Sequence, residues 1–374
     1  MSCVLKTEEM RLRDSGEDKN WALGTDNCET EGSSSGTVPE QLLEDFETAL
    51  VEEDLERSQD LYENSALASA STELLEDVLK RPVVEFLALR RFNSLLSLVR
   101  HFRFYPTACE IQGRNLFEHC VDKDNFEGMV FCHEALGVFS TSSNLLLRAV
   151  QHENAAMLQY LHERGLQYKA DSLVTAAVKT RSLPCLEYIR NAMGVQTLAS
   201  PAVLEIALFM ATEHLELTVL DFVSSEFELA FSPKQLGPFR HKKFSLFKTF
   251  SRAVKRDFVE LLEYAYFVLK IDFVSREYDP EWEHYSKLLG YAVERENFKM
   301  LQFLVRTLGL SVALYGELNE DSLLKLIFAK VSDPRLLKKM IKFVLPHESR
   351  ENLKNLKTQL SLAEYSLLQG LRHR

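Results

Sequence analysis

The residues best suited to metal chemistry are two neighbouring pairs, His119-Cys120 and Cys132-His133. Two cysteines and two histidines form a common structural zinc site. Their spacing does not match the usual motifs, in which two or three residues separate paired ligands. Both cysteines also fall at positions of the helical pattern below that favour small core side chains. We therefore interpret them as core residues whose adjacent histidines face away from the thiols, and we expect no metal or other cofactor.

Other catalytic arrangements are weaker still. Cys185 could act as a nucleophile in principle, but it follows Pro184 at a core-type position, which predicts an inert, buried thiol. The sequence has no GxxxxGK[ST] or GxGxxG loop for phosphates, and no HExxH motif. The sequence therefore predicts a non-enzymatic protein. An active site assembled from residues far apart in the chain stays open as an alternative.

A basic run over residues 234–256 could bind an anionic partner, since it carries no acidic residue and interleaves phenylalanines with its cations. A solvated charged face, a site for an acidic protein surface (including this chain's own acidic segment), and a site for nucleic acid or anionic lipid all fit this composition. Arg240-His-Lys-Lys243 also resembles a weak nuclear-import cluster. The candidate binding residues are Arg240, Lys242, Lys243, Lys248, Arg252, Lys255 and Arg256.

The element that must position these residues is a repeated helical pattern. A small or apolar anchor is followed by apolar residues 8, 9, 11 and 12 positions later, and 38 of the 40 positions in eight copies are hydrophobic. Four copies place a glycine 16 or 17 residues after the anchor, at Gly137, Gly165, Gly194 and Gly309. The anchors are Leu87, Cys120, Ala149, Ala177, Ala211, Ala253, Ala292 and Ala329.

This spacing predicts an all-α fold. Each copy is a helix, a turn and a second helix, which the glycine ends in a left-handed conformation. One pair cannot bury its apolar face, so neighbours must stack into a solenoid. We expect about eight units over residues 81–345, insertions within 223–244 and 272–285, and a capping helix in residues 346–374.

The runs Ala149–Asn154, Met157–Leu161 and Glu163–Leu166 resemble the paired helices and closing glycine of the ankyrin-repeat family. The family's Thr-Pro-Leu-His signature is missing from every copy, so its inter-repeat hairpins are in doubt, and other two-helix units of the tetratricopeptide kind remain an alternative. The resemblance implies a curved stack whose concave face, lined by first helices, recognises proteins. It would place Arg252, Lys255 and Arg256 near that face.

The N-terminal segment differs in charge from the rest of the chain. Residues 1–80 contain 21 acidic and 6 basic residues, whereas residues 81–374 contain 34 and 38. Residues 1–40 are polar and predict a disordered tail. Residues 41–80 predict an acidic amphipathic helix or linker, which either packs on the body or folds on a partner. The acidic segment could also contact the basic run within the same molecule.

The remaining composition predicts an intracellular protein of the cytoplasm or nucleus. The first residues lack the apolar core of a signal peptide, no stretch of about 18 apolar residues predicts membrane insertion, and six cysteines are scattered without a CxxC pair. The leading hypothesis is a scaffold or adaptor that binds a protein partner, with an acidic surface as one possibility. Nucleic-acid binding through residues 234–256 is the second hypothesis.

Overall fold

The computed structural model describes residues 38–372, apart from residues 53, 64, 66, 68–69, 103, 231–244, 276–281 and 320. Several predicted features lie outside the described residues. They are the expected disordered tail with Cys3 and Cys28, parts of both expected insertions, and the candidate residues Arg240, Lys242 and Lys243. Within the described residues the chain is mostly helical, with 21 α-helices. The predicted helical class is therefore confirmed.

The N-terminal region contains four helices, α1 (Glu40–Val51), α2 (Leu55–Glu63), α3 (Thr72–Ala88) and α4 (Phe92–His101). Helix α1 packs on α2 and α3 and buries Phe46 and Leu50. The ring of Phe46 meets that of Phe102 edge-on, with centroids 5.4 Å apart. Of the two expectations for the acidic helix, the structure has the one in which it packs on the body. Helix α3 also runs across the expected boundary at residue 80.

Most of the acidic charge belongs to these packed helices. Residues 40–80 contain 13 acidic and 2 basic residues, whereas residues 1–39 contain 8 and 4. Helix α1 is acidic and amphipathic, and it buries Phe46, Ala49 and Leu50. Its Glu40 and Glu44 are exposed, whereas Glu47 pairs with Arg81 of α3. The acidity of the N-terminal part is thus a surface property of folded helices.

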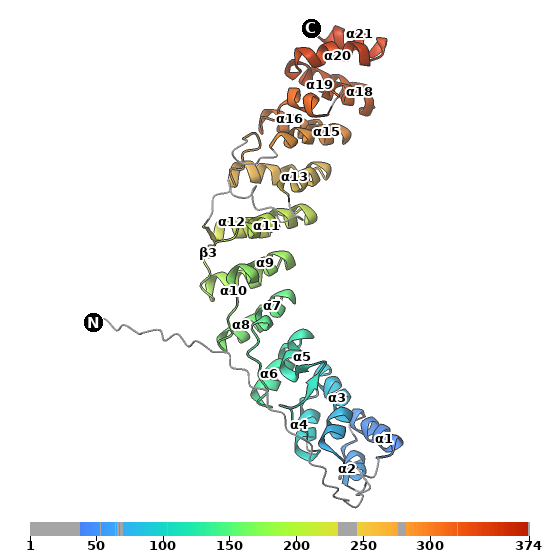
Figure 1. Ribbon diagram of the computed structural model, residues 1–374, viewed down its shortest axis with the longest axis vertical. Helices are drawn as coiled ribbons and strands as arrows, with labels where there is room; N and C mark the ends of the chain where they lie inside the picture. The colour runs from blue at the N-terminus through green and yellow to red at the C-terminus, as the bar shows by residue number, and fades with distance from the viewer. Residues whose placement is uncertain are drawn as a thin grey trace, which may run out of the picture.

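Six helix pairs follow, each with a first helix that carries the anchor and a second helix (Figure 1). Consecutive first helices pack directly on one another from α5 to α15, and α15 packs on α18. Figure 1 shows the array bowed, with the first helices along its concave side and the second helices along the convex side. The pairs are α5 (Leu116–Asp122) and α6 (Phe126–Glu134), α7 (Asn144–Gln151) and α8 (Ala155–Glu163), α9 (Ala170–Thr180) and α10 (Leu183–Asn191), α11 (Pro201–His214) and α12 (Thr218–Glu226), α13 (Leu246–Lys255) and α14 (Val259–Glu263), and α15 (Lys287–Glu294) and α16 (Phe298–Arg306).

The predicted core positions are buried in these six pairs. The anchors from Cys120 to Ala292 are at most 5% exposed, and the residues 8, 9 and 12 positions later are also buried. The closing glycines have positive φ angles between 68° and 89°, as predicted. At Gly137, Gly165 and Gly194 an added Cβ would meet no atom within 4 Å, so the backbone angle alone requires glycine there.

The turn inside each pair contains a feature that the sequence pattern does not announce. The residue four positions after the anchor is left-handed although it is not glycine, with φ angles from 53° to 61°. The next residue donates its backbone N–H to the anchor carbonyl, and in four pairs its side chain caps the second helix. The left-handed residues are Asp124, Glu153, Arg181, Leu215, Asp257 and Glu296, and the capping residues are Asn125, Asn154, Ser182 and Asn297.

Two anchors were placed wrongly. Arg90 is the left-handed residue after α3, so the equivalent anchor is Phe86, one residue before Leu87. Ala329 is exposed at the end of α18 (Leu323–Lys330), whereas Ile327 is fully buried. The predicted spacing does not hold in the eighth copy, because the loop between α18 and α19 (Pro334–Val344) has a different length. The buried residues Met340 and Ile341 therefore do not lie 8 and 9 residues after the anchor.

The short strands and the C-terminal end complete the described chain. Strands β1 (Glu110–Ile111) and β2 (Arg114–Asn115) form an antiparallel hairpin, and β3 (Thr197–Leu198) pairs in parallel with β4 (Glu228–Leu229). Beyond α19, two helices, α20 (Arg350–Gln359) and α21 (Leu362–Arg372), stand where we expected one. The other elements are the π-helix η3 (Tyr264–Val268), the 3-10 helices η4 (Trp282–Ser286) and η5 (Leu345–His347), and α17 (Val312–Asn319).

Candidate functional site

Neighbouring first helices are joined by a recurring side-chain pair. The residue just before the anchor of one first helix contacts the residue two positions after the anchor of the preceding one. Arg148 pairs in this way with Asp122 at 2.5 Å, and Arg252 pairs with Glu213. We call these two places the pre-anchor and post-anchor positions. Both positions belong to the first helices, which lie along the concave side (Figure 1).

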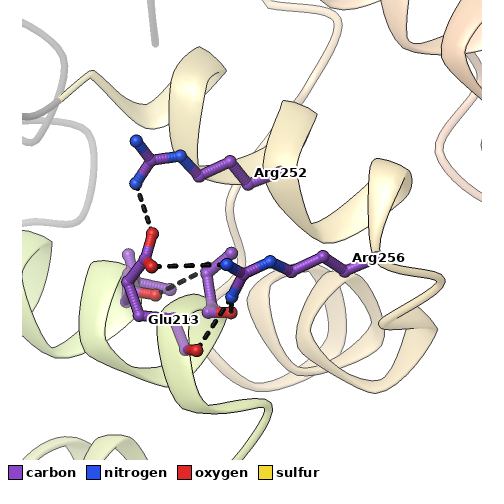
Figure 2. Close-up of polar contacts among 5 residues, drawn as sticks. Glu213, Arg252 and Arg256 are labelled. Atoms are coloured by element: carbon purple, nitrogen blue, oxygen red, sulfur yellow. Dashed lines mark hydrogen bonds and ion pairs between the residues drawn. The ribbon is translucent and has the colours of Figure 1, made fainter.

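The predicted basic run contributes most of its described cations to such joints (Figure 2). Figure 2 shows Arg252 of α13 and Arg256, the residue that follows α13, converging on Glu213 of α11. Arg256 donates to the backbone oxygens of Thr212 at 2.9 Å and Glu213 at 2.8 Å. These carbonyls belong to the last turn of α11, which has no further helical N–H groups to accept from and carries the negative end of the helix dipole. Arg256 therefore caps α11 from the next helix.

Of the other described residues of the run, some contact neighbouring helices and some are exposed to solvent. The ammonium of Lys255 lies over the ring of Tyr291 on α15, 3.8 Å from its centroid, at the same pre-anchor to post-anchor register. Lys248 is exposed. Phe250 is fully buried, as its core position predicts, and stacks against Phe273 and Tyr285. Three of the four described candidate cations thus hold α11, α13 and α15 together.

The convex side has its own ladder of polar contacts, made by the residue eleven positions after the anchor. Tyr160 bonds His133 of the preceding pair at 2.7 Å, and Tyr188 bonds His162 at 3.0 Å. Tyr264 bonds Asp221 of the preceding pair at 2.8 Å, and burial raises the pKa of its hydroxyl to about 12. We expected this position to line the buried stripe, but it is only half-buried in all six pairs, whether it holds a tyrosine or a phenylalanine.

The cysteine positions behave as core. Cys120 and Cys132 are buried with their Sγ atoms 3.9 Å apart. The contact with Cys120, followed by burial, raises the pKa of the Cys132 thiol, and burial raises the pKa of Cys185, so both thiols are held protonated. His133 turns to Tyr160. Over the described ranges, no group of three or more His, Cys, Asp or Glu side chains has the arrangement of a metal site.

The joint between α3 and α5 is built differently from the others. With Phe86 as the anchor of α3, its post-anchor residue is Ala88, and the pre-anchor residue of α5 is His119. Both line a cleft of about 480 Å³ between the two helices. The other lining residues are Val84, Leu87, Arg90, Cys120, Lys123, Asp124 and Asn125. The small post-anchor side chain of Ala88 lines this gap.

His119 is the buried polar group of this cleft. It is 8% exposed, and among the described residues its imidazole has no hydrogen-bond partner. Burial lowers its pKa, and the charges of Lys123 and Arg114 lower it further. Sequence reasoning considered His119 only as a metal ligand. It missed the cleft because the predicted anchor, Leu87, was one residue off, so Ala88 was not identified as the post-anchor residue of α3.

A second buried group without a partner is Glu205, on the same helical stripe of α11 as Glu213. It is 6% exposed, and its Oε2 atom makes no hydrogen bond. Burial raises the pKa of its carboxyl group to about 8. The residue sits one turn before Phe209, whose ring carries the guanidinium of Arg252 at 5.1 Å. A charge at this position is unfavourable, and sequence reasoning did not single it out.

Comparisons place no known protein beside this arrangement. No protein-family model, curated protein or solved structure matches the chain. Among the described helices, none is both long and apolar enough to cross a bilayer.

Proposed function

We propose that this protein is a non-catalytic scaffold or adaptor, built as a divergent ankyrin-like array of helix pairs, that binds a protein partner along its concave face. The observation that carries the proposal is the row of first helices from α5 to α18, which pack on one another in chain order. A stack of this kind buries its apolar stripes between neighbours and leaves a long, rigid surface.

The recurring turn supports the repeat interpretation independently of the hydrophobic spacing. Six pairs share a left-handed residue four positions after the anchor and a backbone hydrogen bond from the next residue to the anchor carbonyl. Neither feature entered the choice of anchors. A common turn geometry in successive pairs is what units of one repeat type would have.

The concave surface has exposed side chains of its own that vary between pairs. Gln151, Lys179 and Glu294 occupy post-anchor positions and are exposed on α7, α9 and α15. Lys248 adds an exposed cation on α13. Variation at fixed positions of a rigid row gives a surface that can be specific for one partner.

Nucleic-acid binding remains the second candidate, but it has less support. Contacts to phosphates need lysine and arginine side chains that are not already engaged within the protein. Arg252, Lys255 and Arg256 are instead engaged within the protein. An acidic protein surface, which needs fewer free cations, is the better fit.

The test is differential capture by the full-length protein from a cell lysate, followed by mass spectrometry. The concave variant is Lys179→Glu with Lys248→Glu. The matched control is Lys299→Glu with Lys342→Glu, which changes the charge equally on exposed residues of the second helices α16 and α19. We expect a reproducible set of proteins that is lost from the concave variant and kept by the control.

Equal retention by both variants would contradict the concave surface. A control that loses the same proteins would point to a nonspecific charge effect. Capture of RNA or DNA that falls steeply with salt and is lost from the concave variant would favour the second candidate.

A further inference from the structure

The α3–α5 cleft lacks a carboxylate that equivalent joints supply from within the chain. Where the pre-anchor residue is basic, at Arg148 and Arg252, the post-anchor residue of the preceding helix is an acid, Asp122 or Glu213. At the α3–α5 joint the pre-anchor residue is His119, a potential cation, but the post-anchor residue is the exposed Ala88. The position of the acid is open to solvent instead of being filled.

The wall of the cleft offers two uncommitted donors. His119 is more than nine-tenths buried and has no hydrogen-bond partner among the described residues. Lys123 is exposed, and over the same ranges no ion pair to its ammonium is found. The acids nearby are engaged elsewhere, since Asp124 accepts from Asn154 at 2.8 Å and Glu127 pairs with Arg90 at 2.9 Å.

The electrostatics and the shape of the cleft select the ligand. Lys123 and Arg114 create the positive field that helps to keep His119 neutral, and an incoming anion would offset it. Val84, Leu87 and Ala88 give the cleft an apolar side that suits the methylene groups of a side chain. Its volume of about 480 Å³ falls within the range of sites that enclose a small ligand group.

We propose that this cleft binds the carboxylate of a glutamate or aspartate side chain from an acidic segment of a protein partner. The carboxylate takes the place that Asp122 takes at the α5–α7 joint and Glu213 takes at the α11–α13 joint, facing His119 and Lys123. The chain's own acids on α1 to α3 are fixed on helices already packed against the body, which leaves the cleft for a partner in trans. This inference rests on the proposed binding function and names the chemistry of the partner.

The first experiment supplies the acid from within the full chain. Ala88→Glu is compared with Ala88→Gln, which has the same shape without the charge, and the pKa of His119 is measured by NMR titration of its Hε1–Cε1 signal. We expect the pKa to be higher by about one unit in the Glu variant, because a carboxylate nearby favours the imidazolium. Equal values in the two variants would overturn the proposal.

The second experiment uses the tripeptide acetyl-Leu-Glu-Leu-amide as the probe, with the Gln peptide as its control. We expect the Glu peptide to shift the His119 signal, with affinity at least about tenfold weaker for the Gln peptide and for the Lys123→Ala and Ala88→Glu proteins. Lys123 is exposed, so its substitution leaves the fold intact.

Three results would count against the proposal: no shift at about 10 mM Glu peptide, equal binding of the two peptides, or binding unaffected by both substitutions. A His119 pKa that is already raised in the unmodified chain, and falls when residues 1–37 are removed, would assign the cleft to this chain's own N-terminal segment and overturn the partner in trans. The outcome is separate from the lysate experiment, because Lys179 and Lys248 lie on other helices.

Discussion

The α3–α5 and α11–α13 joints place equivalent positions of the helix pairs side by side, but one joint has a cleft and the other is filled by paired side chains. At α11–α13, Glu213 is held by Arg252 and Arg256, and Arg256 also caps the carbonyls of α11. At α3–α5, Ala88 faces His119 across a cleft. The charged joint is closed, and the joint with little charge is open.

This difference shows that local charge density is a poor guide to a binding surface. The sequence marks residues 234–256 as the most basic run of the chain, yet three of its four described candidate cations are engaged by neighbouring helices. The α3–α5 joint has no comparable run, but within the described ranges His119 has no hydrogen-bond partner and Lys123 has no ion pair. What decides availability is whether the adjacent helix presents a complementary side chain.

The largest effect should come from removing the apolar support of the closed joint. Phe250→Ala deletes a fully buried ring that packs on Phe273 and Tyr285, so we expect a loss of about 3–5 kcal/mol in the free energy of unfolding, measured with urea. The half-buried Phe247 provides the control, and Phe247→Ala should cost clearly less. Equal losses would mean that the ring is not part of the core.

The next effect concerns a paired and an unpaired acid on one helix, Glu213 and Glu205. Burial raises the pKa of Glu205 from 4.5 to about 8, so the folded state holds its proton more tightly than the unfolded state does. The contribution of Glu205 to the free energy of unfolding is therefore complete below about pH 4.5 and is lost as the pH rises towards 8. Glu205→Gln should remove this loss.

Urea unfolding at pH 5 and pH 8.5 measures the difference. We expect the Gln variant to be more stable than the unmodified protein by on the order of 1–3 kcal/mol at the higher pH, and to be closer to it at the lower pH. Glu213→Gln should instead be destabilising at both values, because its carboxylate is paired. A Glu205→Gln protein whose advantage does not grow with pH would show that Glu205 is not a buried charge.

The smallest effect compares two cations at the same position, three residues after the anchor. Arg256 bonds two backbone carbonyls, whereas Lys123 has no ion pair among the described residues. We expect Arg256→Ala to cost about 1 kcal/mol, with little dependence on salt, and Lys123→Ala to change stability by less than about 0.5 kcal/mol. Thermal unfolding at low and high salt measures both, and a larger loss for Lys123 would indicate a structural role for it.

Much of the fold follows from the sequence because a helix buries one stripe of its surface. The apolar spacing after Ala149, Ala177 and Ala292 identifies residues that are buried, and Gly137, Gly165, Gly194 and Gly309 identify where second helices end. These signals are local, since both depend on residues within about two turns of the same helix or on one backbone angle. For the same reason the sequence alone indicated buried, unreactive roles for Cys120, Cys132 and Cys185.

The tertiary structure alone decided which polar residues meet. Arg148 and Asp122, or Arg252 and Glu213, are tens of residues apart, and their contact depends on how far one helix slides along the next. That axial register is set by core packing and by turns such as those at Asp124 and Asp257, whose left-handed conformation has no glycine to announce it. With Phe86 as its anchor, α3 has the same turn as the other first helices, and its small post-anchor residue Ala88 lines the cleft together with His119.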